Sequence, residues 1–450
     1  MNDITAFFAF LRYCLGYKGD MSSVVTGMDW QELYSFASKQ ALQGLCFEGI
    51  ERLGEEYPEK LKQNPIGREL LMTWMGKAQQ IRRQNRKVNT VASKLFSMLR
   101  EDGLRCCVLK GQGNALMYPN PYSRTPGDID VWIDASRERI MEYAQKKFEL
   151  GDDIRLQHLE TSLEGVPVEL HFFPCSMNNP IYHARLQKWF RRNADLQCSH
   201  IVGLPDGAGD IAIPTTAFNV IYQLTHLYHH FFDEGIGMRQ IIDYFLVVND
   251  FSKNVFLNND LSNPSVSLSK GSSTSHPSPL SSEERDVTAL RCSEPLRSRD
   301  GGASKPSPNC AGWDRLAIEE DNSAGSTTIV TSSVSTALVV VQRELKYLGL
   351  WKFAGAVMYV LHEALGLSEE KMIAPLDEKR GKLLLAEILN GGNFGRHFTK
   401  YGGFTHQSMG KKYFLKIWRN MHFVRFFPAE ALSEPIFRTW HFFWRMKYKK

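Results

Sequence analysis

Two short stretches in the first half of the chain alternate apolar and polar residues with the period of two that is typical of a β-strand. In the first stretch, Asp128 and Asp130 alternate with isoleucine and valine, and in the second, Glu169 and His171 alternate with valine and leucine. Side chains at alternate positions of a strand point to the same face of a sheet. The pattern therefore predicts two strands that each carry acidic side chains on one face and apolar side chains on the other.

Most other apolar positions recur at helical spacing, which divides the chain into five predicted regions. An N-terminal helical region, 1–103, precedes an α/β core, 104–175, and a helical region, 176–251, completes that core. Residues 252–336 are rich in Ser, Pro and Gly, so they bury too little apolar surface to offset their ordering entropy and are predicted to be a disordered insertion. A C-terminal helical region, 337–450, follows. The predicted fold class is α+β, with a small mixed sheet enclosed by N- and C-terminal helices.

Three segments refine this plan. One extended helix is predicted from about Arg68 to Leu99, and a shorter one begins at Arg137. The basic run Arg82–Lys87 is interpreted as a solvated helix face rather than an RNA contact. The tail Phe437–Lys450 mixes aromatic residues with cations, which is compatible with a membrane surface or a nucleic acid, although a last helix packed by its aromatics is the favoured interpretation.

Composition narrows the class of protein without fixing its partners. The chain has 450 residues, of which 43% are hydrophobic, and its formal net charge of +5 is mild, so it fits an anionic substrate without demanding nucleic acid. Its eight cysteines show no zinc-site spacing and are expected to be reduced core thiols. We find no signal peptide and no run of about 20 apolar residues that could span a membrane, so a cytoplasmic protein is expected.

Three carboxylates are the candidate metal ligands. If the two acidic strands pair, roughly 4.8 Å apart, Glu169 joins Asp128 and Asp130 at one edge of the sheet. Carboxylates so close repel one another unless a cation lies between them. Mg²⁺ prefers hard oxygen ligands, usually a few carboxylates together with substrate phosphates. The arrangement of these carboxylates on two neighbouring strands therefore predicts a site for two Mg²⁺ ions and a nucleoside triphosphate (NTP). Asp128, Asp130 and Glu169 are the predicted catalytic residues.

A glycine turn precedes these carboxylates in the sequence. Gly111 and the residue after it, Gln112, belong to a loop that allows close approach of the backbone to phosphate. Lys110 and Arg124 are cations of the kind that bind phosphate oxygens. These four residues are the predicted nucleotide-binding set.

Four further residues are candidate supporting or substrate contacts. His171 is interpreted either as a hydrogen-bond partner of a metal-binding carboxylate or as a strand-end residue. His226 and His230 share a helix face, but no Glu directly follows His226, so a structural or substrate-contacting role is favoured over zinc binding. Arg239 and Asp243 are four residues apart on a predicted helix and are expected to pair.

These motifs resemble the uncharacterised bacterial nucleotidyltransferase family within the DNA polymerase beta-like nucleotidyltransferase superfamily. The resemblance covers most of the chain outside the predicted insertion and implies a minimal α/β nucleotidyltransferase core that uses two Mg²⁺ ions. It further implies that Asp128, Asp130 and Glu169 match the metal carboxylates and Gly111 the phosphate-contacting turn. That superfamily usually carries Gly-Ser or Gly-Gly where this chain has Gly111-Gln112. The motifs that carry the resemblance are Leu109–Gly111, Tyr118-Pro119, Arg124, Asp128–Asp130, Glu169–His171, His226, His229, Gly237, Arg239, Asp243, Phe427-Pro428 and Trp440–Phe443.

The expected function is transfer of a nucleoside monophosphate from an NTP to a hydroxyl acceptor. RNA, protein and a small molecule all remain open as the acceptor, and the sequence predicts no oligomeric state. The alternative is a non-catalytic nucleotide- or partner-binding protein that keeps the scaffold, for which Gln112 in the turn is the main support. On charge repulsion alone, Asp130→Asn is expected to leave stability equal or higher.

Overall fold

The computed structural model describes residues 3–150, 155–260, 332–397 and 409–448. The predicted insertion lies mostly outside these residues, although α11 and α12 cover its two ends. The longer helices are α1 (Asp3–Cys14), α3 (Trp30–Lys39), α4 (Gln43–Glu56), α6 (Arg68–Glu101), α8 (Arg137–Lys147), α9 (Pro180–Ser199), α10 (Thr216–Asp233), α11 (Met238–Asp260), α12 (Ser332–Tyr347), α13 (Trp351–Leu365), α14 (Glu378–Gly391), α15 (Met409–Met421) and α16 (Pro428–Tyr448). Shorter helices are α2 (Ser22–Thr26), α5 (Pro58–Gln63), α7 (Gly111–Ala115), η1 (Pro121–Ser123), η2 (Pro205–Gly207), η3 (Glu369–Lys371) and η4 (Asn393–Gly395).

One four-stranded mixed sheet carries the acidic residues. Its strands are β1 (Cys106–Leu109), β2 (Ile129–Ile133), β3 (His158–Leu163) and β4 (Val166–His171), in the order β1-β2-β4-β3. β2 and β4 are parallel, whereas the two outer pairs are antiparallel. A second, two-stranded sheet pairs β5 (Ile201–Gly203) with β6 (Asp210–Ala212). The small mixed sheet and its flanking helices confirm the predicted α+β class.

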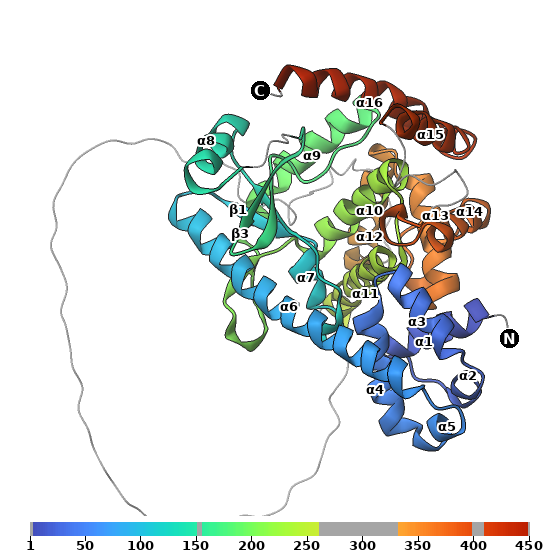
Figure 1. Ribbon diagram of the computed structural model, residues 1–450. Helices are drawn as coiled ribbons and strands as arrows, with labels where there is room; N and C mark the ends of the chain where they lie inside the picture. Colours follow the sequence, from blue (N-terminus) through green and yellow to red (C-terminus); the bar gives the residue numbers. More distant parts are fainter. Residues whose placement is uncertain (1–2, 151–154, 261–331, 398–408, 449–450) are drawn as a thin grey trace, which may run out of the picture. The chain divides into compact units, whose positions relative to one another are not determined.

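The two faces of the four-stranded sheet differ in chemistry, as the alternation predicts. On one face Val131 packs in an apolar cluster with residues of α6 and α8. On the other face Trp132 stacks on Phe218 of α10, with ring centroids 6.2 Å apart. Figure 1 shows the long helix α6 running past the sheet while α9 lies on its other side. The carboxylates of β2 and β4 therefore face α10.

α6 confirms the extended helix predicted from the basic, glutamine-rich segment. Its buried side chains, among them Trp74 and Val88, line one side of the helix. Arg83, Arg86 and Lys87 of the basic run are exposed, whereas the half-buried Arg82 forms ion pairs with Glu48 and Glu51 of α4. The solvated-face interpretation therefore holds for the three exposed residues of that run.

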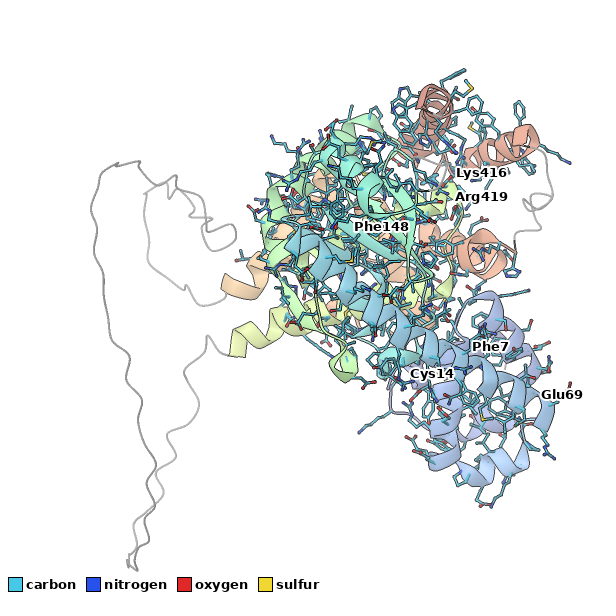
Figure 2. The ribbon with its side chains drawn as sticks, turned by 60° about the vertical axis from the view of Figure 1, so that its left-hand side comes forward. Phe7, Cys14, Glu69, Phe148, Lys416 and Arg419 are labelled. Carbon is cyan, nitrogen blue, oxygen red and sulfur yellow. The ribbon has the colours of Figure 1, made fainter. Side chains whose placement is uncertain are left out.

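The C-terminal helices are held to the preceding ones by polar contacts as well as by aromatic packing. Lys416 and Arg419 project from α15 toward α10 (Figure 2), where Lys416 Nζ lies 3.2 Å from Asp233 Oδ1 and Arg419 donates to the carbonyl of Phe231 at 2.8 Å. On α16, the buried Glu430 accepts the backbone N–H of Asn178 at 2.6 Å. None of the helices in the described ranges is both long and apolar enough to cross a membrane.

Glu430→Gln is expected to remove a pH-dependent part of the stability. Burial raises the pKa of Glu430 from 4.5 to about 7. The folded protein therefore binds this proton more tightly than the unfolded chain, so the free energy of unfolding should fall as the pH rises from about 4.5 to about 7. The fall expected from this group is about 3 kcal/mol. Urea unfolding at a series of pH values measures it.

The exposed carboxyl of Glu370 supplies the control for this measurement. Glu370→Gln should keep the full fall in stability, whereas Glu430→Gln should flatten it. An unchanged pH dependence in Glu430→Gln would show that another group is responsible.

Candidate active site

The register of two strands brings the predicted carboxylates together. Asp130 of β2 lies directly opposite Glu169 of the parallel strand β4. The two side chains share a partner, because His171 Nε2 lies 3.0 Å from Asp130 Oδ1 and 3.1 Å from Glu169 Oε2. Asp128 precedes β2 and lines the same cavity as both. The predicted pairing of these strands is confirmed, and its consequence is one acidic edge.

The glycine turn delivers a lysine to that edge. Leu109, the last residue of β1, is the register partner of Asp130, and the chain then turns sharply at Lys110 and Gly111. Both have positive φ, +53° and +37° respectively. Lysine is strained in this region, whereas glycine is not. Strain of this kind persists only where the surroundings enforce it, and here it directs Lys110 Nζ to 2.9 Å from Asp130 Oδ1.

Lys110 and His171 balance the buried negative charge. Although burial opposes it, Lys110 and the hydrogen bond from His171 lower the pKa of Asp130 well below its usual range. The pKa of His171 is lowered by burial but raised more strongly, to about 9, by its bonds to Asp130 and Glu169. Asp130 and burial raise the pKa of Asp128 to about 6. The edge therefore holds carboxylates in different electrostatic environments, as sites of acid–base or metal chemistry do.

His158 is a site residue that sequence reasoning missed. β3 runs antiparallel to β4, which places His158 opposite His171 and Glu160 opposite Glu169. His158 Nδ1 lies 3.4 Å from Glu169 Oε2, and among the described residues neither ring nitrogen has a hydrogen-bond partner. Burial lowers the pKa of His158 to about 3, so the ring is neutral and its lone pair is free for a ligand. The available signal was the His-x-Glu of β3, which mirrors the Glu-x-His of β4.

The donor atoms of this edge fit a divalent cation. One ligand atom each from His158, Glu169 and His171 lie within 4.8 Å of one another. The neighbouring carboxylates of Asp128 and Asp130 add oxygen donors. Carboxylate oxygens suit Mg²⁺ or Mn²⁺, whereas imidazole nitrogens extend the choice to zinc. The donor chemistry and the unpartnered nitrogens of His158 are thus compatible with a bound metal ion.

A cavity of about 600 Å³ opens beside the carboxylates. Its volume is within the range of sites for small ligands. A smaller cavity shares Lys110, Asp128 and Asp130 with it and extends toward Gly111 and Arg239. Both cavities therefore border the carboxylates of Asp128 and Asp130.

α10 closes one side of the larger cavity with histidines. Lys110 Nζ lies 2.8 Å from His226 Nε2, and because an ammonium only donates, His226 accepts this bond as a neutral ring. Burial and then Lys110 lower the pKa of His226 well below its usual value. His230 Nε2 is 3.0 Å from the same nitrogen of His226. This sharing of one nitrogen favours the structural or substrate-contacting interpretation of the pair over zinc binding.

The predicted pair of Arg239 with Asp243 is not the one that the structure shows. Asp243 instead pairs with Arg124 through two hydrogen bonds. Arg124 Nε donates to one carboxylate oxygen of Asp243 at 2.8 Å, and a terminal guanidinium nitrogen donates to the other at 2.8 Å. Tyr118 donates a further hydrogen bond to Asp243 at 2.8 Å. Arg239 instead donates to the carbonyl of Thr125 at 3.0 Å, and within the described ranges its Nε has no hydrogen-bond partner. Asp243 pairs with the distant Arg124 rather than with Arg239, because the buried guanidinium of Arg124 forms two parallel hydrogen bonds with the carboxylate.

Gln112 points away from the acidic edge. Its side chain is buried and donates to the side chain of Asn89 on α6. Of the four predicted nucleotide-binding residues, Lys110 lies at Asp130, Gly111 lines the smaller cavity, and Arg124 lines that cavity while bound to Asp243.

Residues 26–262, more than half of the chain, match the model of a protein family described as uncharacterised nucleotidyltransferase. The chain belongs to this family. All of the predicted site residues lie inside the matched range, whereas α12 to α16 lie outside it. No curated protein and no solved structure matches the chain. Membership in this nucleotidyltransferase family supports nucleotidyl transfer in general terms and an NTP as the substrate.

Proposed function

We propose that this nucleotidyltransferase transfers a nucleoside monophosphate from an NTP to a hydroxyl acceptor. The acceptor oxygen attacks the α-phosphorus, a new O–P bond forms, and the bond from that phosphorus to the bridging oxygen of the β-phosphate breaks. Pyrophosphate leaves, and the proton of the hydroxyl passes to a carboxylate. The observation that carries the proposal is the register of Asp130 opposite Glu169 beside a cavity of about 600 Å³.

Asp128, Asp130 and Glu169 would hold two Mg²⁺ ions, with Asp130 shared between them. Bound Mg²⁺ supplies charge stabilisation for the attacking and leaving oxygens of an in-line displacement. Glu169 is proposed to take the proton of the acceptor hydroxyl. His158 and His171 contact Glu169 and orient its carboxylate, and the neutral ring of His158 offers a nitrogen donor that Mn²⁺ accepts more readily than Mg²⁺.

Lys110 has a place in this reaction that follows from its contacts. Its ammonium is held between Asp130 and His226, next to the position that we propose for a phosphate. Gly111 follows it with a positive φ that leaves space for a phosphate to approach the backbone. We propose that Lys110 moves from Asp130 to the triphosphate when nucleotide and metal bind.

Arg239 is the second proposed phosphate ligand. It lines the smaller cavity with Asp128, and its Nε has no hydrogen-bond partner within the described ranges. A buried guanidinium with a donor to spare favours an anion beside it. Arg124 lines the same cavity, but its fork is bound to Asp243, so we propose that Arg124 positions the turn before Asp128 while Arg239 contacts phosphate.

The decisive experiment uses two labels. The purified full-length chain is incubated with a cell extract, Mg²⁺ or Mn²⁺, and each NTP carrying ³²P on either the α- or the γ-phosphate. The proposal requires transfer of the α label to an acceptor, with the γ label released as pyrophosphate. If NTP binds with metal but no α label is ever transferred, the scaffold alternative replaces the enzyme.

Arg239→Gln is expected to weaken NTP binding by about ten- to hundredfold, because one charge-assisted hydrogen bond is worth about 1.5–3 kcal/mol. The melting temperature of the free protein should change little, because the substitution removes one hydrogen bond, to the Thr125 carbonyl, but also removes a buried charge. Calorimetric titration with NTP measures the dissociation constant.

Arg105 provides the matched control for this variant. It lies on the surface, paired with Asp134 and Asp195. Arg105→Gln should leave NTP binding as in the unmodified protein. Equal dissociation constants for the unmodified protein and Arg239→Gln would remove Arg239 from the nucleotide site.

A further inference from the structure

The last two described helices expose a set of large apolar side chains. On α15 these are Phe414, Trp418 and Met421, spaced at i, i+4 and i+7. The second group lies on α16 at i, i+4, i+8 and i+11, and its members are Leu432, Ile436, Trp440 and Phe443. Ile436 is 73% exposed and Phe414 is 71% exposed, which is unusual for residues of this size. We name these seven residues the aromatic face.

The two helices that carry the aromatic face pack against the rest of the protein and against each other. The opposite sides of both helices are buried through residues such as Arg419 and Asn420 on α15 and Ala431 and Glu434 on α16. Tyr413 of α15 and Thr439 of α16 are joined by a hydrogen bond of 2.5 Å, and Figure 1 shows the two helices next to each other. Pro435, Ile436, Trp440 and Phe443 line a shallow depression on α16. The favoured prediction that the aromatics of the tail pack inward is therefore wrong for these exposed members.

The charge of this segment is concentrated and of one sign. Residues 409–450 contain ten lysines and arginines but only two acidic residues, Glu430 and Glu434. Both glutamates are buried, whereas Lys411 and Arg425 are exposed. Because the whole chain has a net charge of +5, the rest of it is slightly acidic. Exposed cations such as Lys411 and Arg425 therefore occur in the same segment as the aromatic face, whereas Lys416 and Arg438 pair with Asp233.

We propose that the aromatic face docks on an anionic lipid surface, with α15 and α16 lying in the plane of the headgroups. Aromatic and aliphatic side chains on a helix that also carries cations are the residues that enter the boundary between headgroups and acyl chains. Lysines and arginines beside them are attracted to acidic lipids. The chain would lie on such a membrane through this face.

Two other occupants fit the face less well. A second copy of the chain would bring two segments of the same strong positive charge together, which repel. A single-stranded nucleic acid stacks its bases on aromatic rings, but Leu432, Ile436 and Met421 offer no ring and are among the exposed residues. An anionic lipid layer satisfies both the charge and the aliphatic side chains.

Flotation of the full-length protein with vesicles tests the proposal. Vesicles of phosphatidylcholine mixed with phosphatidylglycerol should carry the protein, whereas vesicles of phosphatidylcholine alone should carry much less. Raising the salt from about 0.1 M to about 1 M, which shortens the screening length from about 10 Å to about 3 Å, should weaken the binding. The double variant Trp440→Ser/Phe443→Ser should bind anionic vesicles at least about tenfold more weakly, because two large apolar side chains no longer enter the lipid.

Met72 and Ile181 give a matched control, because they are exposed apolar residues on other helices. Met72→Ser/Ile181→Ser should bind vesicles like the unmodified protein, and all variants should keep their melting temperature. Equal vesicle binding by the Trp440→Ser/Phe443→Ser variant overturns the proposal. It is also overturned if no vesicle binding occurs while the unmodified protein either dimerises through Trp440 and Phe443 or binds a single-stranded oligonucleotide through them.

Discussion

Asp130→Asn is expected to lower the rate of nucleotidyl transfer by at least about a hundredfold, because metal catalysis contributes several kcal/mol and each 1.4 kcal/mol is about tenfold in rate. Asp130 is the residue that both proposed ions share, and it also holds Lys110 Nζ at 2.9 Å. Transfer of the α label from NTP measures the rate. Wild-type transfer by this variant would mean that Asp130 binds no catalytic metal.

The same substitution distinguishes two expectations for the stability of the metal-free protein. Charge repulsion alone predicts equal or higher stability for Asp130→Asn. The contacts of Asp130 with Lys110 and His171 reverse this expectation, because an asparagine leaves both buried cations with a weaker partner. We expect the free energy of unfolding to fall by about 1–3 kcal/mol. Asp128→Asn is the control, since Asp130 raises the pKa of Asp128 and removing the Asp128 charge should relieve repulsion instead.

Arg124→Ala is expected to lower the free energy of unfolding by about 3–5 kcal/mol, the usual cost of removing one partner from a buried ion pair. The side chains of Arg124 and Asp243 are 4% and 7% exposed, so the variant leaves the Asp243 carboxylate buried with Tyr118 as its main remaining partner. Chemical unfolding of the full-length chain measures the change. Arg105→Ala is the matched control, because exposed ion pairs contribute at most about 1 kcal/mol.

The two arginine variants together distinguish a positioning role from nucleotide contact. If Arg124→Ala retains the stability of the unmodified protein but loses NTP binding, Arg124 is a phosphate ligand and the sequence-based assignment stands. If Arg124→Ala lowers the free energy of unfolding and Asp243→Asn lowers it by a similar amount, the ion pair stabilises the fold. Arg239→Gln should show the opposite pattern of stable fold and weak binding.

Much of the site could be predicted from local pattern. Alternation predicted that Asp130 and Glu169 lie on the polar faces of two strands, and the structure shows the pairing that brings these faces together. The turn was predicted from the glycine that follows Lys110 in the sequence, and in the structure both residues have positive φ. These features depend on residues that are neighbours in the sequence or in one register.

Other parts of the site depend on contacts between distant segments, which spacing does not show. His158 lies in a strand with a polar sequence, so the weak apolar alternation of β3 hid the residue that faces His171. Asp243 was expected to pair four residues away on its own helix, but Arg124 reaches it from 119 residues earlier. The expected effect of Asp130→Asn on stability also reversed, because Lys110 and His171 contact Asp130 only in the folded chain.

The ion pairs of Asp233 connect the larger cavity to the last two helices, so binding at one of these places should affect binding at the other. Its carboxylate on α10 accepts from Lys416 of α15 and from Arg438 of α16, and both Asp233 and Lys416 line the larger cavity. A ligand in the cavity that attracts Lys416 competes with Asp233 and thereby changes how firmly the two last helices are seated. Thermodynamic linkage makes this effect reciprocal. A ligand of α15 and α16 whose affinity depends on this seating therefore changes the affinity of the cavity for its own ligand by the same factor.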